Sequence, residues 1–266
     1  MKKKLYMGTN TKMYKTAEET EKYIRELAEL TEDISSDILQ RFVIPSFTSL
    51  DKAVKASKGF IQIGAQNVGW EESGQFTGEI SPVMLQEQGV DLVMIGHSER
   101  RHIFHETDFE EEKKVTCALQ HGFTVLLCIG ETALQQEYHI SCEVLAEQLK
   151  IGLKHAPPER AKSKLWIAYE PVWAIGVNGT PAEPSYVEEI HQSVKNVLTG
   201  LFGSEIASQI PVLYGGSVSN ENAVELIRLP AVDGLFVGRS AWDAENFNKI
   251  IRKSLPVFMQ KAQSAI

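Results

Sequence analysis

The chain has 266 residues, of which 43% are hydrophobic and 23% are charged, a globular composition long enough to bury a large core. Its formal net charge of −8 argues against a nucleic-acid-binding protein, because no basic block offsets the acidic balance. An anionic small ligand remains open, since such a ligand responds to local donors rather than to net charge.

The three cysteines, Cys117, Cys128 and Cys142, are far apart and odd in number, which fits a reducing compartment without a disulfide framework. The lysines near the start resemble a signal peptide, but no apolar segment follows them before Gly8. No run approaches the roughly 20 apolar residues that a membrane span needs. We therefore expect a cytoplasmic protein.

Short apolar, β-branched runs and stretches of helical pattern follow one another along the chain. The runs are near-continuous, as in strands that are buried on both faces of a parallel sheet. The clearest helical stretches are residues 16–33, where Thr16 and Glu19 are spaced as a capping box, and residues 184–202. The predicted strands are residues 5–10, 41–46, 60–66, 92–97, 124–130, 165–170, 211–216 and 234–239.

Eight strands with interleaved helices predict an α/β fold, a single-domain (β/α)8 barrel over residues 1–266. An open, doubly wound sheet is the alternative. No low-complexity segment and no break in composition marks a linker between domains. In a barrel, functional side chains gather at the carboxyl ends of the strands.

Several predicted strands end at side chains that suit catalysis. Each also has a plainer interpretation: Lys12 as a solvated lysine, and His97 as a core histidine. An imidazole at the start of a helical turn lies in a positive potential, which favours its neutral form. The side chains that would share one rim are Asn10 and Lys12 after the first strand, His97 and Glu99 at the fourth, Glu131 at the fifth and Glu170 at the sixth.

Glycine-containing turns follow the last two predicted strands, at residues 215–217 and at Gly238. Such turns let backbone N–H groups close around a phosphate. One turn alone is weak evidence, but two turns after strands 7 and 8 match the usual phosphate site of a barrel.

Eight motifs carry a resemblance to a known family. They are TNTKM (9–13), GAQN (64–67), FTGEISP (76–82), IGHSERR (95–101), CIGET (128–132), YEPVWAIG (169–176), LYGGSV (213–218) and VDGLFVG (232–238). On these motifs, nearly the full chain resembles the triosephosphate isomerase family. The resemblance implies interconversion of dihydroxyacetone phosphate and D-glyceraldehyde 3-phosphate through an enediolate, without a metal or cofactor.

The resemblance assigns a catalytic role to five residues. Glu170 matches the general base and His97 the neutral electrophile that polarises the carbonyl. Lys12 matches the lysine that stabilises the developing enediolate and the phosphate, with Asn10 as its neighbour. Glu99 matches a carboxylate that acts on these side chains rather than on the substrate.

The resemblance also implies a lid, a phosphate site and a partner. Thr77 matches the loop that enters the neighbouring subunit, so we expect a homodimer. Backbone donors to the phosphate would be Gly176, Ser217, Gly238 and Arg239. The lid would consist of Pro171, Val172, Trp173, Ala174, Ile175, Gly176, Val177, Asn178 and Gly179, and its closure would exclude water from the substrate.

The sequence departs from the usual family pattern in three places. Arg239 occupies a position that is usually glycine, Thr11 and Tyr14 replace the usual aromatic residue and asparagine, and the end of the lid, residues 177–181, has no lysine. Drift in a true triosephosphate isomerase is the preferred interpretation. The alternative is a pocket changed for a four-carbon erythrulose phosphate, and a non-catalytic phospho-ligand-binding protein is the remote third.

Overall fold

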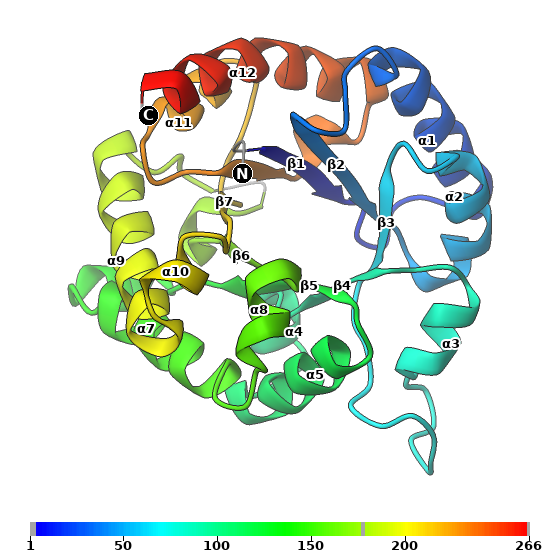
Figure 1. The fold of residues 1–266 in the computed structure, drawn as a ribbon, viewed down its shortest axis with the longest axis horizontal. Helices are drawn as coiled ribbons and strands as arrows, with labels where there is room; N and C mark the ends of the chain where they lie inside the picture. The colour runs from blue at the N-terminus through cyan, green and yellow to red at the C-terminus, as the bar shows by residue number, and fades with distance from the viewer. Residues whose placement is uncertain (1–3, 177–178, 265–266) are drawn as a thin grey trace.

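The computed structural model describes residues 4–176 and 179–264. Within them, eight parallel strands form a closed barrel in sequence order, because β1 pairs with both β2 and β8 (Figure 1). This confirms the predicted (β/α)8 fold. The strands are β1 Leu5–Asn10, β2 Leu39–Ile44, β3 Gln62–Ala65, β4 Leu92–Ile95, β5 Thr124–Ile129, β6 Leu165–Tyr169, β7 Val212–Tyr214 and β8 Gly234–Val237.

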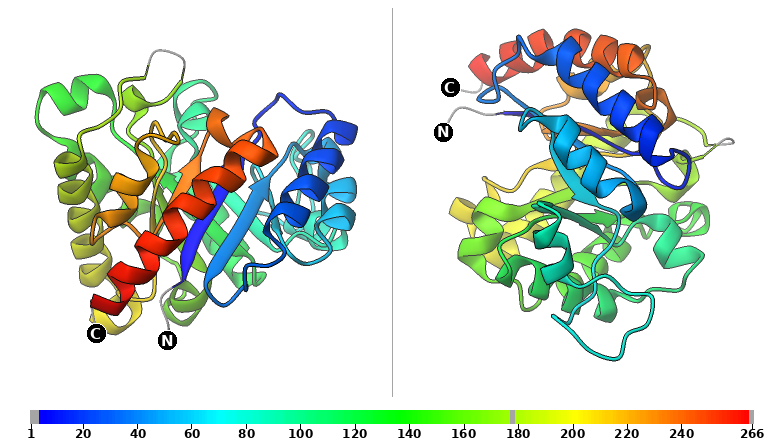
Figure 2. Two further views of the ribbon diagram at one scale, coloured as in Figure 1. Left: turned by 90° about the horizontal axis from the view of Figure 1, so that it is seen from above. Right: turned by 90° about the vertical axis from the view of Figure 1, so that its right-hand side faces the viewer.

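Helices form the outer layer, and the last of them, α12, packs beside α1 (Figure 2). Thr16 caps α1 in the predicted capping box, and α9 covers the predicted residues 184–202. In the described part of the chain, no helix is long and apolar enough to cross a membrane. The helices are α1 Ala17–Thr31, α2 Leu50–Ser57, α3 Pro82–Glu87, α4 Ser98–His102, α5 Asp108–Gln120, α6 Ala133–Glu137, α7 Ser141–Gly152, α8 Pro158–Lys164, α9 Pro184–Phe202, α10 Ser204–Ala207, α11 Ala223–Arg228 and α12 Ala244–Ser264, with 3₁₀ turns η1 Phe47–Ser49, η2 Val172–Ala174 and η3 Arg239–Ala241.

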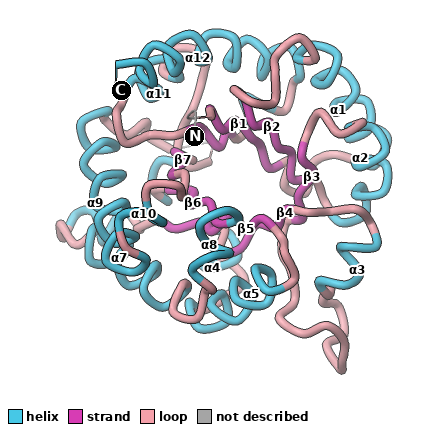
Figure 3. The backbone as a smooth tube through the Cα atoms, in the orientation of Figure 1, coloured by secondary structure: helices cyan, strands magenta, loops and turns pink. Residues whose placement is uncertain are grey.

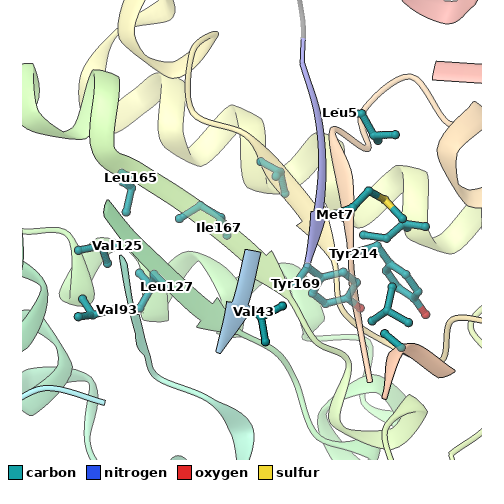
Figure 4. Packing of buried hydrophobic residues seen from close by; sticks show 14 of the residues in the cluster. Leu5, Met7, Val43, Val93, Val125, Leu127, Leu165, Ile167, Tyr169 and Tyr214 are labelled. Atoms are coloured by element: carbon teal, nitrogen blue, oxygen red, sulfur yellow. The ribbon is translucent and has the colours of Figure 1, made fainter. Parts of the chain in front are cut away.

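On most strands, alternate residues enter two different hydrophobic clusters, which explains the near-continuous apolar runs. On β5, Leu126 and Cys128 belong to a cluster of strand residues that fills the barrel. Val125 and Leu127 belong to the larger cluster between strands and helices, part of which Figure 4 shows. Because both faces are buried, most strand positions are apolar, and the buried Arg41 on β2 donates to the carbonyls of Thr31 and Ile34.

The observed strands differ from the predicted ones by up to two residues at their ends. β2 begins at Leu39, two residues before the predicted start, because Leu39 pairs with Leu5 on β1. It ends at Ile44, directly before Pro45, which has no N–H group with which to continue the ladder. Pairing between distant segments therefore decides these ends.

One segment projects from the barrel wall. Residues 66–81 join β3 to α3 as a long loop that extends away from the helical layer (Figure 3). Thr77 lies on this loop and is exposed. The predicted dimer residue therefore lies on a segment that leaves the barrel at the carboxyl end of β3.

A buried histidine on α9 makes stability depend on pH. His191 is fully buried between the rings of Tyr169 and Tyr214, with centroids 5.7 and 6.2 Å away. Burial, together with the nearby positive charge of Lys195, lowers the pKa of His191 to about 3. In the unfolded chain the pKa is about 6.5, so below that pH the unfolded state alone takes up the proton.

We therefore expect the free energy of unfolding to fall as the pH drops from 6.5 towards 3, by about 1.4 kcal/mol per pH unit from His191 alone. Urea denaturation at pH 6.5 and pH 5 measures this loss. Acidic residues add their own dependence, so the informative comparison is with His191→Phe, which keeps a ring but cannot titrate. An equal loss in both proteins would contradict the assignment.

Candidate active site

A cavity of about 340 Å³ opens at the carboxyl ends of the barrel strands. Segments that follow β1, β4, β6, β7 and β8 contribute to its lining, so side chains far apart in sequence meet there. All nine residues predicted for catalysis and phosphate binding line it: Asn10, Lys12, His97, Glu99, Glu170, Gly176, Ser217, Gly238 and Arg239.

The end of β1 directs an ammonium group into the cavity. Lys12 has a left-handed backbone with φ of 53°, which is unfavourable for a side chain of this kind. Its N–H donates to Asn10 Oδ1 at 2.7 Å, and Gln66 Nε2 donates to the Lys12 carbonyl at 2.7 Å. Lys12 Nζ then donates to Glu99 Oε1 at 2.6 Å. The strained backbone is thus held by neighbours that fix the position of the amine.

His97 is oriented by the helix that it begins. It is the N-cap of α4, and its Nδ1 accepts a hydrogen bond from the Glu99 N–H at 3.2 Å. A ring nitrogen that accepts carries no proton, so the imidazole proton is on Nε2. The 3.7 Å approach of Nδ1 to the Glu99 carboxylate is therefore no ion pair. His97 Nε2 lies 3.7 Å from Glu170 Oε1 and can donate into the cavity.

Glu170 follows the last residue of β6 and is almost fully buried. Its N–H donates to the Ile129 carbonyl at 2.8 Å, which fixes the backbone beneath the carboxylate. Gly215 leaves room for the side chain, because a Cβ there would lie 2.8 Å from Glu170 Cγ. A carboxylate in such a place can exchange a proton with a ligand that water hardly reaches.

Cys128 lies below this carboxylate. Burial raises the pKa of the Cys128 thiol well above its ordinary value, and the negative charge of Glu170 raises it further. The thiol therefore stays neutral. This agrees with its place in the apolar cluster inside the barrel.

Open backbone marks another corner of the cavity. A Cβ on Gly176 or Gly238 would meet nothing within 4 Å, so a ligand can approach the main chain at both residues. Gly176 also has φ of 91°, a conformation that other residues rarely adopt. Together with Ser217, these positions match the predicted phosphate corner.

The predicted lid starts beside a buried carboxylate, Glu131, whose contacts sequence reasoning missed. Glu131, just past β5, is fully buried, and its carbonyl accepts the N–H of Val172 at 3.0 Å. Its Oε1 accepts three hydrogen bonds, from Trp173 Nε1 at 2.8 Å, Tyr186 Oη at 2.9 Å and Tyr169 Oη at 3.0 Å. Its position at a strand end was visible in the sequence, but its partners were not.

The structure describes residues 171–176 and Gly179 of the predicted lid. Val172–Ala174 form the turn η2, and Ala174, Ile175 and Gly176 line the cavity. Gly179 lies against the backbone of Ala174. Val177 and Asn178 lie outside the described residues.

Two aromatic residues form a wall that sequence reasoning did not foresee. Trp242 Nε1 donates to the Asn10 carbonyl at 2.9 Å, which ties the segment after β8 to the end of β1. The ring of Tyr14 packs on Trp242 with centroids 4.6 Å apart. Arg239 lines the same cavity from the preceding turn. Tyr14 and Arg239, two departures from the usual pattern, thus line one pocket.

Comparisons with known proteins agree with this geometry. Residues 5–254 match the family model described as triosephosphate isomerase. The chain is 43% identical over 251 residues to an L-erythrulose-1-phosphate isomerase of Rhizobium etli, covering 94% of this chain and 92% of that protein. Proteins of the same name from Rhizobium meliloti and Mesorhizobium japonicum are each 42% identical over 250 residues, covering 94% of this chain and 96% of theirs. The chain therefore belongs to the triosephosphate isomerase family and is a sugar-phosphate isomerase.

Proposed function

We propose that the protein isomerises a four-carbon ketose phosphate, L-erythrulose 1-phosphate. The observation that carries the proposal is the shared name of relatives that are 42 to 43% identical over more than nine-tenths of both chains. From the sequence alone, a triose phosphate is the preferred substrate and a four-carbon ketose phosphate is the alternative. The relatives favour that alternative, and the departures at Tyr14 and Arg239 fit a changed pocket better than drift.

The same chemistry serves either substrate. Both ketoses have a phosphate ester on the carbon next to the carbonyl and a hydroxyl on the carbon at its other side. L-Erythrulose 1-phosphate differs by a hydroxymethyl group on that hydroxyl-bearing carbon. The proton to be removed is on this carbon in both cases, so one catalytic set acts on both and only the room around it has to differ.

In the proposed mechanism, Glu170 removes the proton from the hydroxyl-bearing carbon. The Nε2–H of His97 donates to the carbonyl oxygen and shuttles protons between the two oxygens of the enediolate, and the Lys12 ammonium stabilises the negative charge that develops there. Glu170 then returns a proton to the former carbonyl carbon, so the carbonyl moves by one position. Asn10 and Glu99 hold Lys12 in place.

Steady-state assays of the purified protein test the proposal. We expect kcat/KM for L-erythrulose 1-phosphate to exceed that for dihydroxyacetone phosphate and glyceraldehyde 3-phosphate by about 10²-fold, the discrimination that one small group can give. Proton NMR in deuterated water identifies the products. Turnover of the triose phosphates near the ceiling of about 10⁸ M⁻¹s⁻¹ would establish the triose instead. Phosphate-ester binding without any turnover would indicate a binding protein.

We also propose that the protein is a cytoplasmic homodimer held by residues 66–81. Their loop projects from the barrel (Figure 1). Phe76 on the loop and Met84 just after it are about half exposed, and Met13 is almost fully exposed. Light scattering should give twice the chain mass of 29.7 kDa. Thr77→Asp should shift the protein towards the single-chain mass, whereas Ser36→Asp, before β2, should not. A wild-type mass of one chain at micromolar concentration would exclude the dimer.

A further inference from the structure

The charges that line the cavity are finely balanced. Four side chains with acidic or basic groups line it among the described residues: Lys12, Glu99, Glu170 and Arg239. Lys12 Nζ is 2.6 Å from Glu99 Oε1, so these two charges neutralise each other. The buried Glu170 carboxylate remains, and Arg239 alone offsets it. Without Arg239 the cavity would carry net negative charge, in a chain whose formal net charge is −8.

A phosphate ester is a poor match for a negative cavity. It brings nearly two negative charges at neutral pH, and Glu170 is too buried for water to screen fully. Backbone N–H groups at Gly176, Ser217 and Gly238 supply partial charges only. A full positive charge at the same corner would remove the mismatch.

The guanidinium of Arg239 is available for that role. In the described part of the chain, no hydrogen bond, ion pair or ring contact reaches it, whereas Arg100 and Arg101 are both held by carboxylates. An exposed arginine is usually just solvated. Arg239 differs from such an arginine because it is the next residue after Gly238, where the backbone is open to the cavity.

The base of this side chain is firmly placed. Arg239 begins the turn η3, and the turn is closed by the Trp242 N–H, which donates to the Arg239 carbonyl at 3.1 Å. Trp242 in turn is bound to Asn10 and packs on Tyr14. A flexible cation therefore starts from a fixed point beside open backbone, and its planar group can bind two phosphate oxygens at once.

We propose that the Arg239 guanidinium binds the phosphate group of the substrate and makes the pocket selective for phosphorylated sugars. The proposal rests on the proposed function only in taking a phosphate monoester as the ligand. It assigns to the side chain a role beyond that of the Arg239 backbone N–H.

Calorimetry with inorganic phosphate tests the contact without requiring turnover. Arg239→Met should weaken phosphate binding by about tenfold or more, and Arg239→Lys should recover part of the loss, because lysine keeps the charge but not the two-pronged geometry. Arg160→Met, on α8 outside the cavity, removes the same charge from the chain and should leave binding unchanged. Raising the salt concentration should reduce the difference between wild type and Arg239→Met.

Steady-state kinetics add a second readout. In Arg239→Met, KM for the phosphorylated substrate should rise more than kcat falls, since the phosphate is not at the reacting carbons. Three results would each overturn the proposal. Arg239→Met could keep its phosphate affinity and KM within twofold of wild type, it could lose no more phosphate affinity than Arg160→Met does, or the wild type could fail to bind phosphate. A wild type that binds phosphate but does not isomerise L-erythrulose 1-phosphate would overturn the proposed function alone.

Discussion

Replacing Glu170 with glutamine should lower kcat by roughly 10²- to 10⁴-fold, the range that a positioned general base contributes. Glutamine has the same shape, so it fits the space that Gly215 leaves, but its amide cannot accept the proton from the substrate carbon. Phosphate affinity should not fall, because glutamine removes a negative charge from the cavity and Glu170 lies on the His97 side rather than at the open-backbone corner. Steady-state kinetics and calorimetry with inorganic phosphate separate the two effects.

Glu170→Asp separates position from charge. The shorter side chain keeps the carboxylate but withdraws it from the substrate, and a misplacement of about 1 Å can cost 10²-fold in rate. We expect an intermediate kcat and an unchanged melting temperature. Glutamine and aspartate variants that both keep more than a tenth of the wild-type kcat would show that another group removes the proton.

Lys12→Met should lower kcat/KM by about 10³-fold, comparable with the loss of a donor that stabilises transition-state charge. Of the two basic side chains among the described cavity-lining residues, Lys12 and Arg239, the Lys12 ammonium is the one that contacts Glu99. Its removal also leaves Glu99 without its partner, so the cavity becomes more negative. Unlike Glu170→Gln, this variant should therefore lose phosphate affinity as well as turnover.

The fold should survive this change. Residue 12 already adopts φ of 53° with a lysine, and methionine introduces no further backbone strain there. Lys12→Arg provides the matched variant: it keeps the charge but differs in reach and geometry, so its activity should lie between those of Lys12→Met and wild type. Circular dichroism checks folding. Activity of Lys12→Met within tenfold of wild type would mean that the enediolate charge is stabilised elsewhere.

The strands could be predicted from the sequence because each one buries both faces. Val125 to Cys128 read as one apolar run, although alternate residues enter different clusters. The exact first and last residues of the strands could not be predicted. Phe60 and Ile61 have strand-like character, yet β3 begins at Gln62, where pairing with Phe42 begins. Such pairing joins segments that no local pattern connects.

The candidate site could be predicted where its side chains lie at the ends of strands. Local sequence places His97 and Glu170 there, and the resemblance supplies their expected roles. The function of Glu131 could not be found in this way, because its three donors are 38, 42 and 55 residues away along the chain. Substrate length was likewise beyond reach, since the proposed catalytic residues would serve three-carbon and four-carbon substrates alike.

The three hydrogen bonds that the Glu131 carboxylate accepts restrict how the proposed lid can move. A hydrogen bond to a charged group contributes about 1.5–3 kcal/mol, so a lid conformation that breaks the Trp173–Glu131 bond is about 10- to 150-fold less populated, other contacts being equal. This bond therefore holds Trp173 in place, and we expect any closing movement of the proposed lid to take place after it, at Ala174, Ile175 and Gly176, which line the cavity.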